Sequence, residues 1–262
     1  MPPAGTDELL DLALDAAAAA AAVLLERLPT ARAGATTKTS ATDMVTATDR
    51  EVEALLRDRL LGRRPADGFL GEEMGETPGT SGIRWVVDPI DGTTNFLYGH
   101  PGCNVSVAAE DGEGSVVGVV VDPLLRDTFA AARGGGAHRN GTAIRCRPAD
   151  DLADALCATG FSYDPDRRGR QGEVLARVLP HIRDVRRLGA AALDLCSVGC
   201  GRVDAYWEKG LGPWDLAAGG LIAREAGARV ELEGTLGFVL AAPPGLFAAL
   251  RDLLVDSGAP RA

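Results

Sequence analysis

Histidine, paired cysteines and basic charge are scarce in this 262-residue chain. It has three histidines, five cysteines with no CxxC pair, and 37 acidic against 27 basic residues. No partner pattern surrounds the histidines, so neither a histidine-centred catalytic base nor a zinc site is expected. The odd number of cysteines favours a reduced, cytoplasmic protein that uses them as small core residues.

The net charge of −10 argues against two classes of partner. It would repel a nucleic-acid backbone or an anionic membrane surface, so neither is expected as the main partner. A small phosphorylated substrate remains compatible, because bound divalent cations reverse the local sign of an acidic pocket.

No targeting or membrane-spanning segment is expected from the sequence. The N-terminal residues do not carry the basic region that opens a signal peptide. The alanine-rich stretch 16–25 is too short to span a bilayer and predicts part of a packed helix. With 46% hydrophobic residues, the chain can bury a sizeable core as one large domain or two smaller ones.

Helix and strand signals alternate along the chain. The first half predicts helices at 7–27 and 48–61 and strands at 69–71, 84–88, 104–109, 115–121 and 128–132. The second half predicts strands at 155–159, 184–187, 203–207, 228–231 and 237–241, with helices at 170–181, 190–200, 214–225 and 245–255. That alternation indicates an α/β layer covered by helices.

Two short segments mark the organisation further. Pro148, Asp150 and Asp151 interrupt the pattern, which predicts an N-terminal α+β domain over 1–147 and a C-terminal α/β domain over 148–262. The glycines at 134–136 predict a hairpin turn, because no Lys-Ser or Lys-Thr follows as in a phosphate loop.

Residues 85–96 read W-V-V-D-P-I-D-G-T-T-N-F and are the most informative stretch. An apolar run predicts a buried strand that ends in Asp88 and Asp91. Gly92 then permits a tight turn, and Thr93 and Thr94 stand where a helix could begin. Two acids on a stiff turn, followed by hydroxyls and free backbone N–H groups, indicate a meeting point for a hard cation and a phosphate. An ordinary acidic turn is the alternative, since Asp-Pro and Asp-Gly are common turn pairs.

Three more acids stand at element ends. Glu72 follows a short apolar run, Asp49 lies in the first turn of a predicted helix, and Asp215 follows Pro213 at a helix start. Singly, each has a simple explanation, because acids complement the helix macrodipole or are solvated in loops.

Taken together and in this order, the acids resemble the pattern of the inositol monophosphatase family of lithium-sensitive, magnesium-dependent phosphatases. The resemblance extends from Lys38 to about Val230. Its carriers are Lys38 with D-M-V-T-A-T-D at 43–49, G-E-E at 71–73, the 85–96 stretch, R-R-L-G-A-A-A-L-D-L-C at 186–196, D-A-Y-W-E at 204–208 and P-W-D-L-A-A-G at 213–219. It implies an α+β fold, a layered αβαβα sandwich of the inositol monophosphatase and fructose-1,6-bisphosphatase type, and a homodimer.

The resemblance also implies two or three Mg²⁺ ions in each active site. Glu72, Asp88 and the carbonyl oxygen of Ile90 would hold one ion, and Asp88, Asp91 and Asp215 a second. Glu72 with waters would offer a weaker third site. An oxygen-only ligand set agrees with the preference of magnesium.

The catalytic residues implied by the resemblance are Thr93, Asp49 and Glu72. Thr93 and Asp49 would orient and deprotonate the attacking water. Backbone N–H groups from Gly92 to Thr94 would hold the phosphate oxygens, and Asp91 and Asp215 would also contact the substrate.

Substrate recognition is implied at two further places. Gly189, Ala190 and Ala191 would form a backbone surface near the substrate ring, although small residues serve close helix packing equally well. Glu208 would accept hydrogen bonds from substrate hydroxyls, with a surface charge beside Lys209 as the alternative. The basic stretch 163–170 is expected to be a solvated turn, with contact to substrate or a second subunit as the alternative.

The sequence thus predicts a cytoplasmic, Mg²⁺-dependent phosphomonoesterase for a small polyol phosphate, with inositol 1-phosphate as leading candidate. L-histidinol phosphate is the runner-up within the same chemistry. Fructose bisphosphate, nucleotide 3′-phosphates and NADP are further alternatives, because specificity resides in loops around the site. The rival from another class is a non-catalytic regulatory protein that retains the fold.

Overall fold

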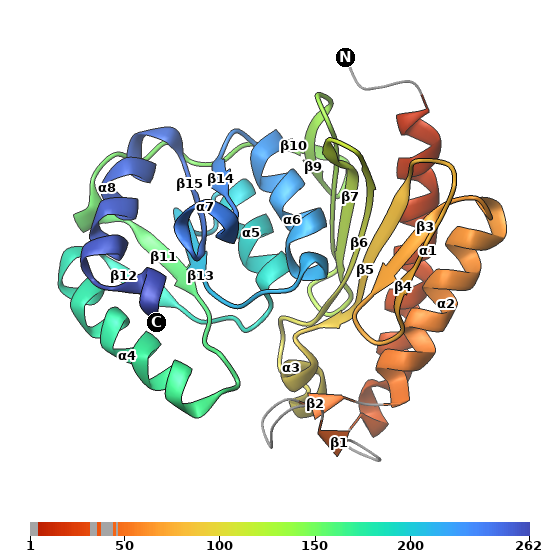
Figure 1. Cartoon of the computed structure of the whole chain (residues 1–262), viewed down its shortest axis with the longest axis horizontal. Coiled ribbons are helices and arrows are strands. Elements are labelled where there is room, and N and C mark those ends of the chain that lie inside the picture. The colour runs from red at the N-terminus through yellow and green to blue at the C-terminus, as the bar shows by residue number, and fades with distance from the viewer. Residues whose placement is uncertain (1–4, 32–35, 38–43, 46) are drawn as a thin grey trace.

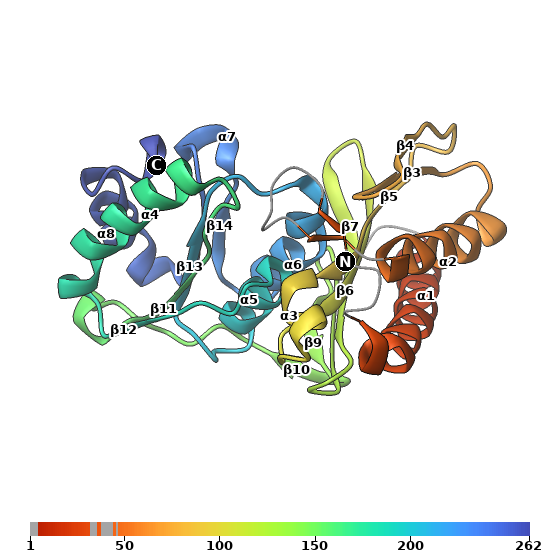
Figure 2. The ribbon, with the colours of Figure 1, turned by 90° about the horizontal axis from the view of Figure 1, so that it is seen from below.

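The fold is layered, with two β-sheets separating three layers of helices (Figures 1 and 2). The computed structural model describes residues 5–31, 36–37, 44–45 and 47–262. Lys38 and Asp43, which contribute to the family resemblance, lie outside the described residues. The αβαβα order expected from the sequence is confirmed.

The helices and strands fill most of the described chain. The helices are α1 Thr6–Arg27, α2 Ala47–Arg63, α3 Thr93–Tyr98, α4 Pro165–Val178, α5 Ala191–Gly199, α6 Pro213–Glu225, α7 Glu233–Leu236 and α8 Pro244–Asp256. The strands are β1 Thr36–Thr37, β2 Met44–Val45, β3 Gly68–Gly71, β4 Gly75–Thr77, β5 Arg84–Asp91, β6 Asn104–Asp111, β7 Gly114–Asp122, β8 Asp127–Ala132, β9 Gly136–Arg139, β10 Thr142–Ile144, β11 Leu156–Thr159, β12 Asp184–Arg186, β13 Ala205–Glu208, β14 Arg229–Glu231 and β15 Val239–Ala242.

The two large sheets differ in strand direction. The eight-stranded sheet has the order β10-β9-β8-β7-β6-β5-β3-β4 and is antiparallel except where β3 pairs with β5. The five-stranded sheet has the order β12-β11-β13-β15-β14, with β11 parallel to both of its neighbours. The eight-stranded sheet uses residues from 68 to 144 and the five-stranded sheet residues from 156 to 242. The domain boundary at 147/148 stays a prediction.

Apolar side chains fill each of the four spaces between the five layers. Within β5, Trp85 and Val87 point toward α1 and α2, whereas Val86 points toward α5 and α6. This alternation follows from the two-residue period of a strand and shows that both faces of the sheet are covered. Two further clusters lie on either face of the five-stranded sheet, one toward α5 and α6 and the other toward α4 and α8.

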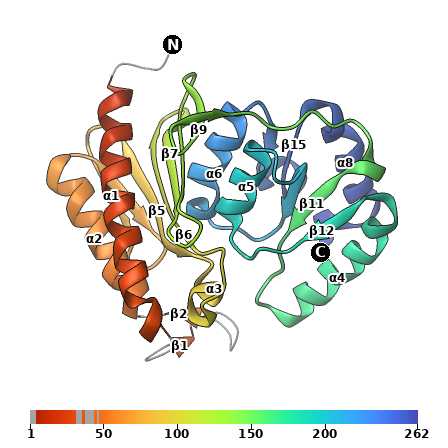
Figure 3. The same cartoon turned by 180° about the vertical axis from the view of Figure 1, so that it is seen from behind.

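Helix α6 lies between the two sheets, beside α5 (Figure 3). A Cβ atom on Gly118 of β7 would stand 2.9 Å from both Cα and the carbonyl oxygen of Ala218, so only glycine permits this approach. The Ser106 hydroxyl donates to the Trp214 carbonyl oxygen at 3.2 Å, and the Ser115 hydroxyl to that of Ala217 at 2.9 Å. These contacts fix the first turn of α6 against the eight-stranded sheet.

We expect Gly118→Ala to lower the free energy of unfolding by about 1–3 kcal/mol, because the added methyl group has to displace the α6 backbone. Urea unfolding followed by circular dichroism measures the change. Gly112→Ala is the matched control, since its Cβ would meet nothing within 4 Å. Equal unfolding midpoints for the two variants would contradict the tight packing of α6.

The structure departs from the sequence-based expectations in several places. Helix α4 begins at Pro165, not near residue 170, because the Asp164 carboxylate accepts a hydrogen bond from the Arg167 N–H at 2.7 Å and caps the helix. The expected turn over 163–170 is therefore wrong from residue 165 onward, whereas the expected solvent exposure of most of these residues is confirmed. Strand β5 continues through Pro89 to Asp91. Elements β1, β2, β4, β9, β10 and α7 were not anticipated, whereas the hairpin turn at 134–136 is confirmed.

The described residues contain no membrane-spanning helix and no disulfide bond. None of their helices combines the length and the apolar character needed to cross a bilayer. All five cysteines have free thiols, and burial raises the pKa of Cys103 and Cys157 to about 12.

Candidate active site

A bulge in β5 brings Asp88 and Asp91 to the same face of the strand. In a regular strand, residues three apart point to opposite faces. Here Asp88 pairs with Ser106 and Asp91 with Asn104, so an advance of three residues along β5 matches an advance of two residues along β6. The extra residue in β5 makes the side chains of Asp88 and Asp91 point to the same face of the strand. Proline is tolerated inside such a bulge because a ladder hydrogen bond is already missing there.

The Asp91 carboxylate is held by three hydrogen-bond donors from other parts of the chain. The Asn104 amide donates to Oδ2 at 2.8 Å. The backbone N–H of Ala191 donates to Oδ1 at 3.1 Å, and that of Ala192 donates to Oδ2 at 2.9 Å. The first turn of α5 therefore docks directly on the end of β5, and the carboxylate direction is fixed before any ligand binds.

Asp215 completes an acidic cluster from the start of α6. Its Oδ2 accepts a hydrogen bond from the Gly212 N–H at 2.6 Å. One carboxylate oxygen each from Asp88, Asp91 and Asp215 lie within 4.8 Å of one another. Two of these acids are buried and Asp215 is half-buried. Three anionic oxygens at such separations repel strongly unless a cation lies between them.

The environment of the cluster disfavours its charged form. Burial raises the pKa of Asp88 well above its ordinary value, and the charges of Glu72, Asp91 and Asp215 raise it further. Burial and the charge of Asp91 likewise raise the pKa of Asp215. Burial also raises the pKa of Asp91, although its hydrogen bonds from Asn104 and the α5 backbone oppose this shift. The donor set of hard, crowded oxygens therefore suits a divalent cation.

Glu72 lines the same pocket but stands outside the tight cluster. It is half-buried and follows β3 directly. The neighbouring loop is fixed by Glu53 of α2, whose carboxylate accepts hydrogen bonds from the N–H groups of Glu73 at 2.8 Å and Met74 at 2.6 Å. A Cβ atom on Gly71 would lie 2.1 Å from the Glu53 carboxylate, so glycine is required beside Glu72.

Thr93 connects the bulge to α2. Its hydroxyl lies 3.3 Å from Asp49 Oδ1 and 3.0 Å from the Ile90 carbonyl oxygen, and the hydroxyl has one hydrogen for these two acceptors. Gly92 caps α3 with φ 89°, and a Cβ there would lie 2.6 Å from the Gly102 carbonyl oxygen. Both the positive φ and the close approach require glycine.

Most of the sequence-predicted site residues line one pocket with a volume of about 480 Å³. They are Glu72, Asp88, Ile90, Asp91, Gly92, Thr93, Gly189, Ala190, Ala191, Glu208 and Asp215. Asp49 is buried behind Thr93, and Thr94 is half-buried in the first turn of α3; neither contributes to the pocket wall.

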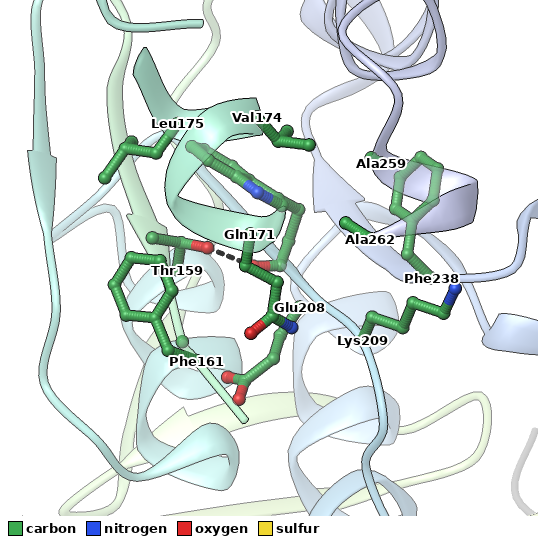
Figure 4. A pocket seen from close by; sticks show the side chains of 12 residues that line it. Thr159, Phe161, Gln171, Val174, Leu175, Glu208, Lys209, Phe238, Ala259 and Ala262 are labelled. Atoms are coloured by element: carbon green, nitrogen blue, oxygen red, sulfur yellow. Dashed lines mark hydrogen bonds between the residues drawn. The ribbon is translucent and has the colours of Figure 1, made fainter. Parts of the chain in front are cut away.

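Glu208 is positioned by two neighbours on the five-stranded sheet and the loop beside it. The buried Tyr206 hydroxyl donates to Glu208 Oε2 at 2.7 Å. A Cβ atom on Gly160 would stand 1.8 Å from the same oxygen. Glu208 also borders a second cavity of about 20 Å³, lined mainly by apolar side chains (Figure 4). The side chain is therefore packed on one side and open to the acidic pocket on the other, unlike a solvated surface charge.

Comparison with known proteins agrees with this geometry. Over residues 6–255 the sequence matches the inositol monophosphatase family. The chain belongs to this family. The family assignment made from the motifs is thereby confirmed, and with it the expectation of an enzyme in a phosphatase family.

Two relatives and one solved structure illustrate the range within the family. Inositol-1-monophosphatase SuhB of Mycobacterium tuberculosis (strain ATCC 25618 / H37Rv) is 50% identical over 224 residues, which cover 80% of this chain and 77% of that protein. The Nus factor SuhB of Vibrio cholerae is 39% identical over 224 residues, covering 85% and 84%. The crystal structure of extragenic suppressor protein suhB from Bartonella henselae gives a TM-score of 0.89 at 35% identity, covering 94% of this chain and 98% of that one.

Sequence reasoning missed several residues of this inositol monophosphatase-family pocket. Glu53 and Asn104 support the predicted acids from elements that are remote in sequence, and no local motif marks them. Tyr206 lies in the motif at 204–208, but its hydrogen bond to Glu208 was not foreseen. Phe161, Tyr163, Arg167, Arg187 and Lys209 line the pocket wall. A signal for Arg167 was present, because it belongs to the basic stretch at 163–170.

Proposed function

We propose that the protein is a Mg²⁺-dependent phosphomonoesterase that hydrolyses a small polyol phosphate, with inositol 1-phosphate as substrate. The observation that carries this proposal is the cluster of Asp88, Asp91 and Asp215 in the wall of one pocket that also holds Glu208. The name of the 50% identical relative from Mycobacterium tuberculosis supports the choice of substrate.

Magnesium fits the acidic cluster. Glu72, Asp88, Asp91, Asp215 and the Ile90 carbonyl oxygen would supply its ligands. When bound, the ions neutralise charge on the transferring phosphoryl group and lower the pKa of a coordinated water. The number of ions, two or three, is part of the proposal.

The residues of the chain then act on the water and the phosphate. If the Ile90 carbonyl oxygen held a cation, Asp49 would be the remaining acceptor for the single Thr93 hydroxyl proton. The Thr93 oxygen can then accept a proton from the attacking water, and Asp49 receives the Thr93 proton. Backbone N–H groups of Gly92 to Thr94 orient the phosphate oxygens for in-line attack.

Glu208 would recognise the polyol by accepting hydrogen bonds from ring hydroxyls. Tyr206 donates to one carboxylate oxygen and thereby orients the Glu208 side chain. The backbone of Gly189 to Ala191, which lines the pocket, would provide the adjoining wall. A homodimer, as the family resemblance implies, is also part of the proposal.

The direct test is phosphate release from a panel of substrates with Mg²⁺, with and without Li⁺. The panel contains inositol 1-phosphate, L-histidinol phosphate, fructose 1,6-bisphosphate, 3′-phosphoadenosine 5′-phosphate and NADP. Preference for inositol 1-phosphate, inhibited by Li⁺, is the expected result. Preference for histidinol phosphate would replace the substrate assignment but keep the chemistry.

A regulatory role is the second candidate, because the Vibrio cholerae relative carries the name Nus factor. The acids and the Thr93 hydroxyl retained in the pocket favour catalysis over that role. No turnover of the panel, despite Mg²⁺ binding shown by calorimetry, would favour the regulatory function.

We expect Gly160→Ala to raise KM for inositol 1-phosphate roughly tenfold, because the methyl group has to displace Glu208 and a charge-assisted hydrogen bond is worth roughly 1.5–3 kcal/mol. Steady-state kinetics on inositol 1-phosphate and on p-nitrophenyl phosphate, which lacks ring hydroxyls, measure the effect. The second substrate should be affected less.

Two companion variants make this result specific. Tyr206→Phe should shift KM in the same direction, since it removes the hydrogen bond that orients Glu208. Gly172→Ala on α4 is the matched control, because its Cβ would meet nothing within 4 Å. An equal loss on both substrates would indicate a general structural defect and contradict polyol recognition by Glu208.

A further inference from the structure

Glu208 lies in the wall of two hollows, the acidic pocket and the second cavity of about 20 Å³. The second cavity lies between α4, β13 and the segment 259–262 (Figure 4). It shares Phe161, Glu208 and Lys209 with the wall of the acidic pocket. A cavity of this volume holds one water molecule or a group of about that size. It is therefore a recess beside the place where the polyol is proposed to bind.

The walls of the second cavity are mainly apolar. Val174 of α4, Trp207 of β13 and Phe238 before β15 all line it, and all three side chains are buried. A buried water molecule needs two to four polar partners, which such walls supply poorly. A small apolar group is favoured there, because its surface is removed from water when it enters.

Two of the polar side chains in these walls are already engaged. The Thr159 hydroxyl donates to the Trp207 carbonyl oxygen at 2.8 Å. The Lys209 ammonium group donates to the Pro260 carbonyl oxygen at 2.6 Å. Neither donor is left for an occupant of the cavity.

Gln171 differs from these two, because only half of its amide is used. The side chain comes from α4, lines the second cavity and is 8% exposed. Its Oε1 accepts a hydrogen bond from the Ser162 N–H at 2.7 Å. Within the part of the chain that the structure describes, its Nε2 donates to no acceptor. A buried amide donor without a partner is costly, so an acceptor on a ligand would stabilise it.

The occupant that suits this cavity combines a methyl-sized apolar end with one hydrogen-bond acceptor. A methoxy group has both, since its methyl group fills the apolar space and its ether oxygen accepts from the Gln171 amide. A hydroxyl group offers a similar oxygen but brings a hydrogen that needs an acceptor of its own. Inositol 1-phosphate carries only hydroxyl groups beside its phosphate and has no apolar substituent for the cavity.

We propose that the second cavity is a side pocket for a methoxy group, and that the favoured substrates are phosphate monoesters of mono-O-methylated polyols. This inference rests on the proposed phosphomonoesterase function and narrows its substrate class. The carboxylate cluster with its cations holds the phosphate, and Glu208 contacts a neighbouring ring hydroxyl. The methoxy group enters the cavity beside Phe161.

The kinetic test compares inositol 1-phosphate with each of its mono-O-methyl ethers. We expect one ether to exceed the parent compound about tenfold in kcat/KM, the equivalent of roughly 1.4 kcal/mol. Gln171→Glu keeps an acceptor for the Ser162 N–H but removes the amide donor, so it should reduce this preference several-fold. Val174→Ile adds one methyl group inside the cavity and should abolish the preference while turnover of inositol 1-phosphate is retained.

Two matched controls lie at exposed positions of the same helix. Glu173→Gln exchanges a carboxylate and an amide outside the cavity, and Ala176→Val enlarges a side chain that does not line it. Both should keep the wild-type preference for the ether. A loss in these controls equal to that in Gln171→Glu and Val174→Ile would overturn the assignment of the cavity.

A binding measurement separates this inference from the proposed function. Calorimetric titration with inositol and with its unphosphorylated mono-O-methyl ethers requires no turnover. One ether should bind the wild-type protein with a lower Kd than inositol, and Val174→Ile should remove the difference.

The two proposals fail in different ways. Hydrolysis of inositol 1-phosphate without preference for any ether, or a preference unchanged in Val174→Ile, would overturn the side pocket alone. Absence of hydrolysis of every member of the series would overturn the proposed phosphatase function, and the titration would then decide the side pocket by itself.

Discussion

Asp91→Asn should abolish most Mg²⁺-dependent phosphate release, with kcat/KM for inositol 1-phosphate reduced about 10³-fold, which corresponds to roughly 4 kcal/mol of transition-state stabilisation. Asp91 contributes to the three-carboxylate cluster, and its second oxygen is fixed by Asn104 and Ala192. The amide has nearly the same shape but loses the charge that a cation requires. Kinetics and calorimetric Mg²⁺ titration together measure the loss.

The control for this variant has to separate metal binding from folding. Asp252→Asn changes one acid to its amide on α8, outside the pocket, and should retain wild-type kinetics and Mg²⁺ affinity. Circular dichroism should show the same helix and strand content for both variants. Full activity of folded Asp91→Asn with Mg²⁺ would refute the assignment of the acidic cluster.

Mg²⁺ should stabilise the protein strongly at neutral pH. A ligand present at 100 times its Kd adds about 2.7 kcal/mol to the free energy of unfolding. For a chain of this size, that free energy raises Tm by about 5–10 °C. Thermal unfolding with Mg²⁺, compared with chelator at equal ionic strength, measures the shift.

The size of this stabilisation should depend on pH in a defined direction. Burial and neighbouring carboxylates raise the pKa of Asp88 and Asp215 in the folded protein. Groups with a raised folded-state pKa contribute stability below their ordinary pKa of about 4 and lose it as pH rises through the folded value. Chelator-treated protein should therefore lose this contribution above about pH 4, and the Tm increase caused by Mg²⁺ should be larger near pH 8 than near pH 5.

Asp88→Asn isolates the cluster from the remaining titrating groups, some of which act in the opposite direction. Ion pairs with arginine lower the pKa of Asp111 and Asp184, so their contribution is lost on acidification instead. In chelator, the Asp88→Asn variant should lose less stability than wild type between about pH 5 and pH 8. An identical pH dependence of the two proteins would show that the cluster does not carry the expected electrostatic strain.

Local sequence patterns predicted most of the helices and strands, because the interactions that form these elements act between residues a few positions apart. The buried run at Trp85 to Val87 forms the centre of β5, and the alanine-rich N-terminal segment forms α1. The start of α4 was placed too late, since the capping by Asp164 was not recognised. The continuation of β5 through Pro89 was missed because proline normally ends a strand, and only pairing with β6 creates the bulge that tolerates it.

The sequence by itself determined the residue types of the candidate site, because each of them belongs to a short local motif. These residues are Glu72, Asp88, Asp91, Thr93 and Asp215. Only the tertiary structure decided which of these side chains meet. The β5 bulge turns Asp88 and Asp91 to one face, and the contact of Gly118 with Ala218 brings Asp215 to them. Whether a charge finds a partner depends on distances between segments that are remote along the chain, and those distances exist only in the folded protein.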